Sequence, residues 1–113
     1  MATEALSRRA RLSGRDVFDS LLRSRSARGE RFVVHAVGNG SAFARLGIVV
    51  SKRVARRAVD RSYLKRLIRE TFRREQTKLA GFDVLVRPRR LPSRVDAAAA
   101  TTELRSLLAT ALR

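Results

Sequence analysis

Residues 51–74 combine a dense positive charge with the apolar spacing of a helix, and no other feature limits the fold as strongly. The segment holds ten Lys or Arg residues against two acids, and so carries half of the formal net charge of +16. From about Arg57 onward, apolar side chains recur on one helical face, because successive residues turn by about 100°. Those side chains are Leu64, Leu67, Ile68, Thr71, Phe72 and Leu79. We predict a helix that packs this face on a core and keeps the rest of its surface charged.

A row of cations lies beside that apolar face. Arg61, Lys65, Arg69 and Arg73 follow one another at i, i+4 spacing, and Arg66 is their neighbour. Like charges at this spacing destabilise a helix by about 0.2–0.5 kcal/mol per pair. A helix face that is only solvated usually mixes Glu with Lys, whereas this row contains no acid. We interpret the row as a binding surface for a polyanion, and for nucleic acid in particular.

The composition limits the class of protein. A chain of 113 residues suits one domain, which we place at residues 1–113 with residues 1–12 as a flexible basic tail. No apolar run reaches the roughly 18 residues of a membrane span, and the first residues lack the apolar segment of a secretory signal. We expect a cytoplasmic protein with no membrane partner.

Several kinds of chemistry are excluded by residue type. The chain has no Cys, which removes disulfides and thiol catalysis, and its single His cannot form a His-rich zinc site. The acids are scattered along the chain, whereas two-metal hydrolysis needs carboxylates that converge on ions about 4 Å apart. We therefore predict no catalytic residue and no metal ligand in this chain.

The pattern of the remaining segments predicts an α-β-β-α-β-α order. The expected elements are a helix from the N-cap Ser13 to about Arg25, a polar loop at 24–30, strands at 31–37 and 42–51, the basic helix from about Arg57, a strand at 82–87, and a helix at 97–112. The first two strands are joined by Gly38, Asn39 and Gly40, so we expect an antiparallel hairpin. The third strand is reached through a helix, so we expect it to run parallel to a neighbour. We also expect Gly81 as the C-cap of the basic helix.

These elements indicate an α+β sandwich, with a small mixed sheet and helices packed mainly on one face. Side chains alternate along a strand, so Phe32, Val34 and Ala36 point one way while Val33 and His35 point the other way. One of these two faces must meet the helices.

Within the basic stretch, the residues follow a specific spacing that resembles the bacterial ribonuclease P protein component. The family pattern is roughly K-K-x-x-x-R-A-x-x-R-N-R-x-K-R-x-x-R-E. The matching residues are Lys52, Arg53, Arg57, Ala58, Arg61, Lys65, Arg66, Arg69 and Glu70, with Arg56 as an additional basic neighbour. The resemblance extends from Arg11 and Leu12 through the FVVHAV strand to the FDVLVRP strand. The chain departs from the pattern at Ser62 and Tyr63, where the family has Asn and Arg.

The resemblance implies a protein subunit that binds a large catalytic RNA and assists endonucleolytic removal of the 5′ leader of precursor tRNA. The active site and its magnesium ions are then expected in the RNA, and the leader in a cleft between the sheet and the first helix. Family members also have a left-handed βαβ crossover, against the usual right-handed rule. We expect the path from the second strand through the basic helix to the third strand to share that hand.

The resemblance also assigns the site residues. The RNA-binding residues are Lys52, Arg53, Arg56, Arg57, Arg61, Ser62, Lys65, Arg66 and Arg69. The leader-binding residues are Phe18 and His35, through aromatic stacking on unpaired bases. The alternatives are that Phe18 is a core residue and that His35 is a half-buried strand residue. Arg87, Arg89 and Arg90 either contact RNA or form a solvated basic turn.

Two other functions fit the charge and size. A small basic ribosomal protein, or another structural RNA-binding protein, has similar composition and would purify with different RNA. A sequence-specific DNA-binding module needs base-reading side chains on a helix and usually a dimer, and the sequence shows neither.

Overall fold

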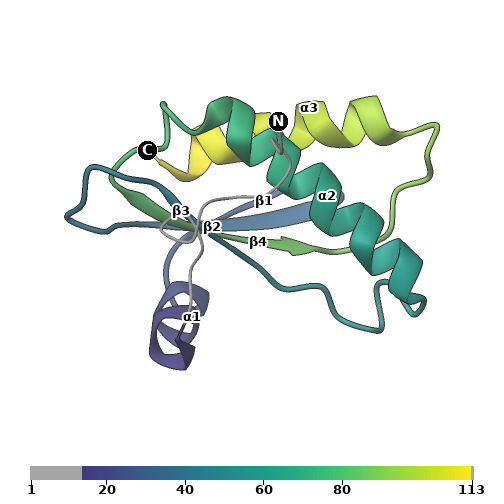
Figure 1. Cartoon of the computed structure of the whole chain (residues 1–113), viewed down its shortest axis with the longest axis horizontal. Coiled ribbons are helices and arrows are strands. Elements are labelled where there is room, and N and C mark those ends of the chain that lie inside the picture. The colour runs from purple at the N-terminus through teal and green to yellow at the C-terminus, as the bar shows by residue number, and fades with distance from the viewer. Residues whose placement is uncertain (1–13, 113) are drawn as a thin grey trace, which may run out of the picture.

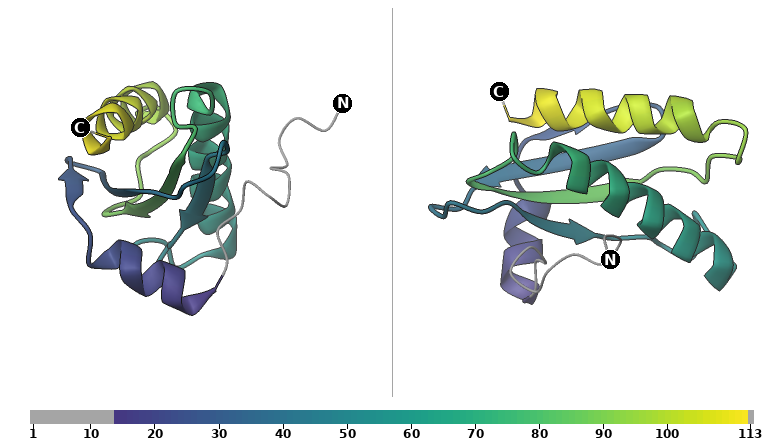
Figure 2. Two further views of the ribbon diagram at one scale, coloured as in Figure 1. Left: turned by 90° about the vertical axis from the view of Figure 1, so that its left-hand side faces the viewer. Right: turned by 45° about the horizontal axis from the view of Figure 1, so that its top comes forward.

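The computed structural model describes residues 14–112, which form one four-stranded mixed sheet with three helices. The elements are α1 (Arg15–Leu22), β1 (Ser26–Arg28), β2 (Phe32–Gly38), β3 (Arg45–Ile48), α2 (Ala58–Glu75), β4 (Phe82–Pro88) and α3 (Ala97–Ala111). Helices α2 and α3 lie side by side on one face of the sheet, and α1 lies on the opposite face (Figure 1, Figure 2). The predicted α+β sandwich with helices mainly on one face is confirmed.

Strand β4 is central in the sheet, and its position explains the topology. The strand order is β1-β2-β4-β3, in which β4 pairs antiparallel with β2 and parallel with β3. The expected hairpin between residues 31–37 and 42–51 is therefore wrong, whereas the parallel pairing of the third predicted strand is confirmed. Val84, Leu85 and Val86 are buried on both faces of the sheet, and a continuous apolar strand of this kind is stable only inside a sheet. Its insertion separates two strands that a short turn would otherwise pair.

Helix α2 connects β3 to β4 as a βαβ crossover, since these two strands are parallel neighbours. This is the crossover that the family resemblance implies. The left hand expected for it stays a prediction.

Strand β1 was missed in the sequence, where residues 24–30 were predicted to be a loop. It pairs antiparallel with β2, and Ala27 is its only buried residue. Ser26 and Arg28 are exposed, so this edge strand has no apolar alternation from which it could be recognised. Its formation depends on the long apolar edge of β2, which is a tertiary contact. Polar side chains on such an edge also discourage pairing with another chain.

Two helix ends differ from the prediction. Ser13, the expected N-cap of α1, lies outside the described residues, and α1 ends at Leu22 instead of near Arg25, because the chain turns there toward β1. Helix α2 has Gln76 as its C-cap, so Gly81 does not cap it. Gly81 instead has a φ of 89° in the turn into β4, where its carbonyl accepts the Asn39 N–H at 2.8 Å. Only glycine adopts this conformation at low cost.

The main core lies between the sheet and the layer formed by α2 and α3. Phe32, Val34 and Ala36 of β2 point into it, as the alternation along this strand predicts. The other strands and the two helices contribute large buried side chains, which include Leu46, Leu64, Ile68, Phe72, Val84, Val86, Leu104 and Leu108. Full burial of each such side chain stabilises the fold by roughly 1.5–3 kcal/mol. The apolar face predicted for α2 is thus seated on the sheet, and the basic face of the helix points outward.

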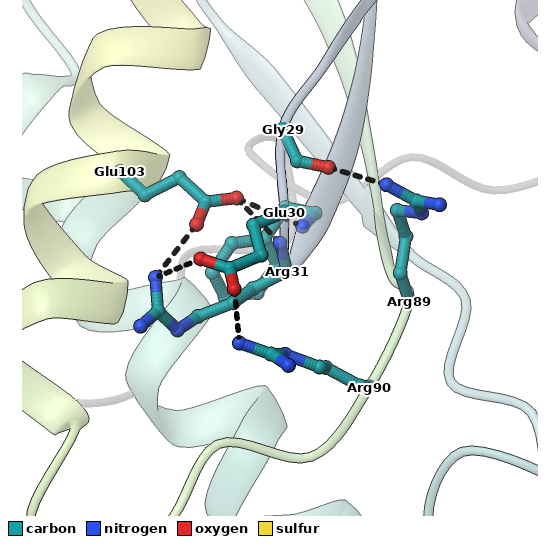
Figure 3. Close-up of polar contacts among 7 residues, drawn as sticks. Gly29, Glu30, Arg31, Arg89, Arg90 and Glu103 are labelled. Atoms are coloured by element: carbon teal, nitrogen blue, oxygen red, sulfur yellow. Dashed lines mark hydrogen bonds and ion pairs between the residues drawn. The ribbon is translucent and has the colours of Figure 1, made fainter.

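Glu103 of α3 forms hydrogen bonds and an ion pair with the turn between β1 and β2 (Figure 3). One carboxylate oxygen accepts the backbone N–H groups of Arg31 and Phe32 at 2.7 and 3.1 Å, and the other accepts Arg31 Nη1 at 2.9 Å. A side chain at Gly29 would collide with this carboxylate. Two backbone donors that no strand satisfies are thereby paired.

We expect Glu103→Ala to lower the free energy of unfolding by about 1.5–3 kcal/mol, because hydrogen bonds to a charged group are lost and buried donors stay unpaired. Urea unfolding followed by circular dichroism measures the change. Thr102→Ala, at an exposed position of the same helix, is the matched control and should change stability by less than about 0.5 kcal/mol. Equal stability of the two variants would contradict the anchoring role of Glu103.

Candidate nucleic-acid interface

The acids of the described chain are concentrated away from the first half of α2. Ion pairs join Glu70 to Arg73 and Arg74, Glu75 to Lys78 and Arg105, Asp83 to Arg45, Glu30 to Arg31 and Arg90, and Glu103 to Arg31. The hydrogen bond from Arg73, with help from Arg74, holds the pKa of the Glu70 carboxyl below its ordinary value. These carboxylates neutralise the C-terminal half of α2, α3 and the sheet ends.

Six cations among the predicted RNA-binding residues make neither an ion pair nor a side-chain hydrogen bond within residues 14–112, and we call them the basic surface. They are Lys52, Arg53, Arg56, Lys65, Arg66 and Arg69. The first three lie in the loop that enters α2, and the other three lie on the helix itself. Arg57 is not included in the basic surface because its exposed side chain forms a long ion pair with Asp60, at 3.9 Å. Cations clustered without carboxylates repel one another in the folded protein, and bound phosphates would relieve this repulsion.

Arg61 organises the loop that carries half of this surface. Its Nη1 atom donates to the carbonyl oxygens of Ala55 and Arg56, at 3.0 and 2.7 Å. These contacts hold the loop against the first turn of α2, and leave the other donors of the guanidinium available. Arg61 thus supports the cations around it, and its own contact with RNA stays a prediction.

The two positions that depart from the family pattern differ in their surroundings. The hydroxyl of Ser62 is exposed and makes no hydrogen bond with the described residues, so it is accessible to a partner. The ring of Tyr63 is half-buried and has the guanidinium of Arg94 above it, 3.7 Å from the ring centre. Ser62 is thus accessible to RNA, and its contact with RNA stays a prediction. Tyr63 instead contacts Arg94 of the same chain.

On the opposite side of the sheet, α1 is seated on a small second cluster. Phe18 lies so close to Gly47 that a Cβ there would be 2.8 Å from its ring, and Leu21 packs on Leu85. Phe18 is half-buried and packs on this cluster. It is therefore part of the apolar contact beneath α1, and its contact with the leader stays a prediction.

His35 lies on this same side of the sheet but is only 3% exposed. Its Nδ1 is 3.4 Å from the carbonyl oxygen of Ser24, and its Nε2 is 3.4 Å from Arg87 Nε. A carbonyl can only accept and a guanidinium can only donate, so the ring is neutral with its proton on Nδ1. Burial lowers the pKa of His35, the Ser24 contact raises it, and the nearby charge of Arg87 lowers it further. The buried faces of the ring are therefore not open to a stacked base. The ring instead accepts a hydrogen bond from Arg87 and so helps to position the Arg87 side chain.

Arg87 lines a hollow that the sequence did not predict, and we call it the arginine groove. It has a volume of about 310 Å³ and is lined by Arg28, Val33, Ser51, Arg53, Val54, Arg87, Pro88 and Arg89. The strand register places Arg28, Val33 and Arg87 in one row across β1, β2 and β4, because directly opposed residues point to the same side. Four arginines and no carboxylate line the hollow. The sequence did not reveal this groove because Arg28 was predicted to lie in a loop, while Arg87 was left with two alternatives, RNA contact or a solvated basic turn.

Comparison with known proteins agrees with this geometry. A family model described as Ribonuclease P matches residues 6–112. The ribonuclease P protein component of Chromobacterium violaceum is 42% identical over 110 residues, which are 96% of this chain and 91% of that protein. The chain belongs to the ribonuclease P protein family. The component of Burkholderia mallei (strain SAVP1) is 39% identical over 99% of this chain and 83% of that protein.

Solved structures of ribonuclease P proteins share the fold. A mutant Staphylococcus aureus protein with defective mRNA degradation activity has a TM-score of 0.70 at 27% identity, over 92% of this chain and 86% of that chain. The Thermotoga maritima protein has a TM-score of 0.65 at 33% identity, over 88% and 92%. The ribonuclease P chain described here is accordingly the protein subunit of an endoribonuclease.

Neither a metal-binding cluster nor a membrane helix is found in the described part of this ribonuclease P protein. Residues 14–112 contain no group of three or more His, Asp or Glu side chains that could hold a metal ion. No helix within these residues is long and apolar enough to cross a membrane.

His35 is the only histidine, so its titration can be followed without overlap. Its pKa is lower in the folded than in the unfolded state, and the unfolded chain therefore binds the extra proton first. We expect stability to be constant above the ordinary pKa of 6.5 and to fall as the pH is lowered through it.

Urea unfolding between pH 5.5 and 7.5, together with NMR titration of the His35 ring, measures this effect. His35→Gln is the control, because an amide offers one donor and one acceptor without titrating in this range. The same pH dependence in both proteins would show that His35 is not responsible.

Proposed function

We propose that the basic surface binds the catalytic RNA of ribonuclease P, and that the α1 side of the sheet binds the 5′ leader of precursor tRNA. The protein then assists the RNA in releasing the mature tRNA 5′ end, in the cytoplasm. The main support for the first part is the absence of carboxylate partners around Lys52, Arg53, Arg56, Lys65, Arg66 and Arg69 within residues 14–112. Cations left unpaired at this density are suited to the phosphates of a folded RNA.

The arginine groove and Phe18 support the second part. A single-stranded leader presents phosphates and unstacked bases, and proteins bind such strands with a positively charged groove and aromatic platforms. Arg28, Arg87 and Arg89 provide charge along the sheet, and the half-buried Phe18 lies on the same side. His35 acts on the leader indirectly, because it holds the Nε atom of Arg87.

Hydrolysis in this proposal is carried out by the RNA. The described carboxylates are engaged in ion pairs or dispersed, and they do not form a site that fits magnesium. The chain's own contribution is to bind, position and neutralise two RNA molecules at once.

Replacing Lys65 or Arg66 by Ala should weaken binding to the catalytic RNA and lower the slope of log K against log salt by about one, because one fewer counterion is released. Filter binding or fluorescence titration between 50 and 300 mM salt, about the range in which such slopes are measured, gives both quantities.

Arg105→Ala is the charge-matched control for these variants. Arg105 is also an exposed helical cation, but it lies on α3 and pairs with Glu75 of α2. Its replacement should leave the slope nearly unchanged. A uniform loss for all three variants would indicate that only net charge matters, and would contradict a defined basic surface.

Replacing Arg87 by Ala should weaken binding of precursor tRNA to the assembled particle only when the leader is several nucleotides long. We expect a loss of about 1–3 kcal/mol for long leaders, typical of contacts along a single strand, and no loss for a one-nucleotide leader. Binding of the two substrates to particles made with each variant measures the difference.

Two controls accompany the leader experiment. His35→Gln should behave nearly as wild type, because it can still accept from Arg87. Protein without RNA should leave the precursor intact. Equal losses for both leader lengths in Arg87→Ala would remove the arginine groove from the leader site.

A further inference from the structure

The loop between β4 and α3, at the right of Figure 1, is contacted by an aromatic side chain of α2. Tyr63 of α2 donates its hydroxyl to the carbonyl oxygen of Ser93 at 3.5 Å, and its ring lies beneath the guanidinium of Arg94 at 3.7 Å. Residues 63 and 94 are far apart in the sequence, so this stack is a tertiary contact and not a local turn. The stack therefore fixes the position of the Arg94 guanidinium in this loop.

Arg94 is exposed and makes no ion pair within the described residues. Stacking covers one face of its planar guanidinium and leaves the N–H groups at the edge free to donate. A guanidinium held in this way has fewer rotamers to lose when it binds an anion, and its donors match the geometry of phosphate oxygens. A loop cation serving only solubility needs no such support.

The position of this stack continues the basic surface. Arg66 lies one helical turn after Tyr63, on the same side of α2, since residues at i and i+3 are neighbours. Tyr63, Arg66 and Arg74 also line one groove between α2 and α3. Glu70, the acid in that groove, is already bonded to Arg73 and Arg74. Tyr63 thus shares this groove with Arg66 and holds Arg94 of the neighbouring loop over its ring.

We propose that Arg94 is a further phosphate-binding residue for the catalytic RNA, and that Tyr63 is the positioning residue that holds it. The inference rests on the proposed function of the basic surface and extends that surface from α2 to the loop before α3. At position 63 the chain has Tyr where the family pattern has Arg. Stacking on Tyr63 places the positive charge of Arg94, which comes from a different segment, next to this position. Tyr63 therefore contributes through Arg94 and not through direct stacking on a base.

The test uses the full chain and the ribonuclease P RNA, with binding measured across a salt series. Arg94→Ala should weaken binding about three- to tenfold near physiological salt and lower the salt slope by about one. Tyr63→Leu should weaken binding similarly when Arg94 is present and cause no further loss in an Arg94→Ala background, because the two residues act as a unit. Tyr63→Phe keeps the ring and should bind as wild type.

The outcomes separate this inference from the proposed function. Wild-type affinity and slope for Arg94→Ala, together with a loss for Lys65→Ala, would overturn the inference and leave the proposed function intact. Wild-type behaviour of both variants would overturn both. Additive losses from Tyr63→Leu and Arg94→Ala would show that Tyr63 contacts RNA itself, which contradicts its positioning role. Circular dichroism confirms that each variant is folded, and Arg94→Ala, at an exposed loop position, keeps the inference about Arg94 testable if Tyr63→Leu unfolds.

Discussion

Repulsion among positive charges is the constraint to which the rest of the structure responds. The chain has 26 Lys or Arg residues and only 10 acids, so most cations must do without a carboxylate partner. The acids are used where they also join elements: Glu75 links α2 to α3 through Arg105, Asp83 links β4 to β3 through Arg45, and Glu103 links α3 to the β1–β2 turn. Many of the cations without an ion pair within residues 14–112 lie on α2, its preceding loop and one end of the sheet. Charge segregation and fold stability thus come from the same few carboxylates.

The central strand separates the two binding surfaces. Successive residues of β4 point to opposite faces, so Val84 and Val86 support the core beneath α2, while Leu85 packs against α1 and Arg87 lines the arginine groove on the same face. In the proposed function, the catalytic RNA and the leader bind on opposite sides of this layer, and Arg53 lies where the two surfaces meet. Because β4 pairs with both β2 and β3, the relative position of the two surfaces is fixed by backbone hydrogen bonds and not by flexible side chains.

Local patterns in the sequence predicted what depends on local spacing. The apolar face of α2 and the alternation in β2 were both recognisable, because the helical and strand periods show in the spacing of neighbouring residues. Strand β1, the insertion of β4 and the stack of Tyr63 on Arg94 were not, because each depends on a partner far along the chain. Missing β1 also concealed the arginine groove, since Arg28 meets Arg87 only through the register across β2. His35 was placed on the correct face, but its burial depends on the segment around Ser24.

Helix α1 packs on the side of the sheet that we propose for the leader, and it does so through few apolar contacts. This helix meets the sheet through Phe18 on Gly47 and Leu21 on Leu85, apart from the main core. Its detachment uncovers only that small cluster, and the packing of α2 and α3 is untouched. Segments with few buried apolar contacts open at free energies well below that of global unfolding. If the leader binds on this side as proposed, a local opening equilibrium of α1 sets the width available to it, and strands of different bulk can be admitted without disturbing the surface proposed for the catalytic RNA.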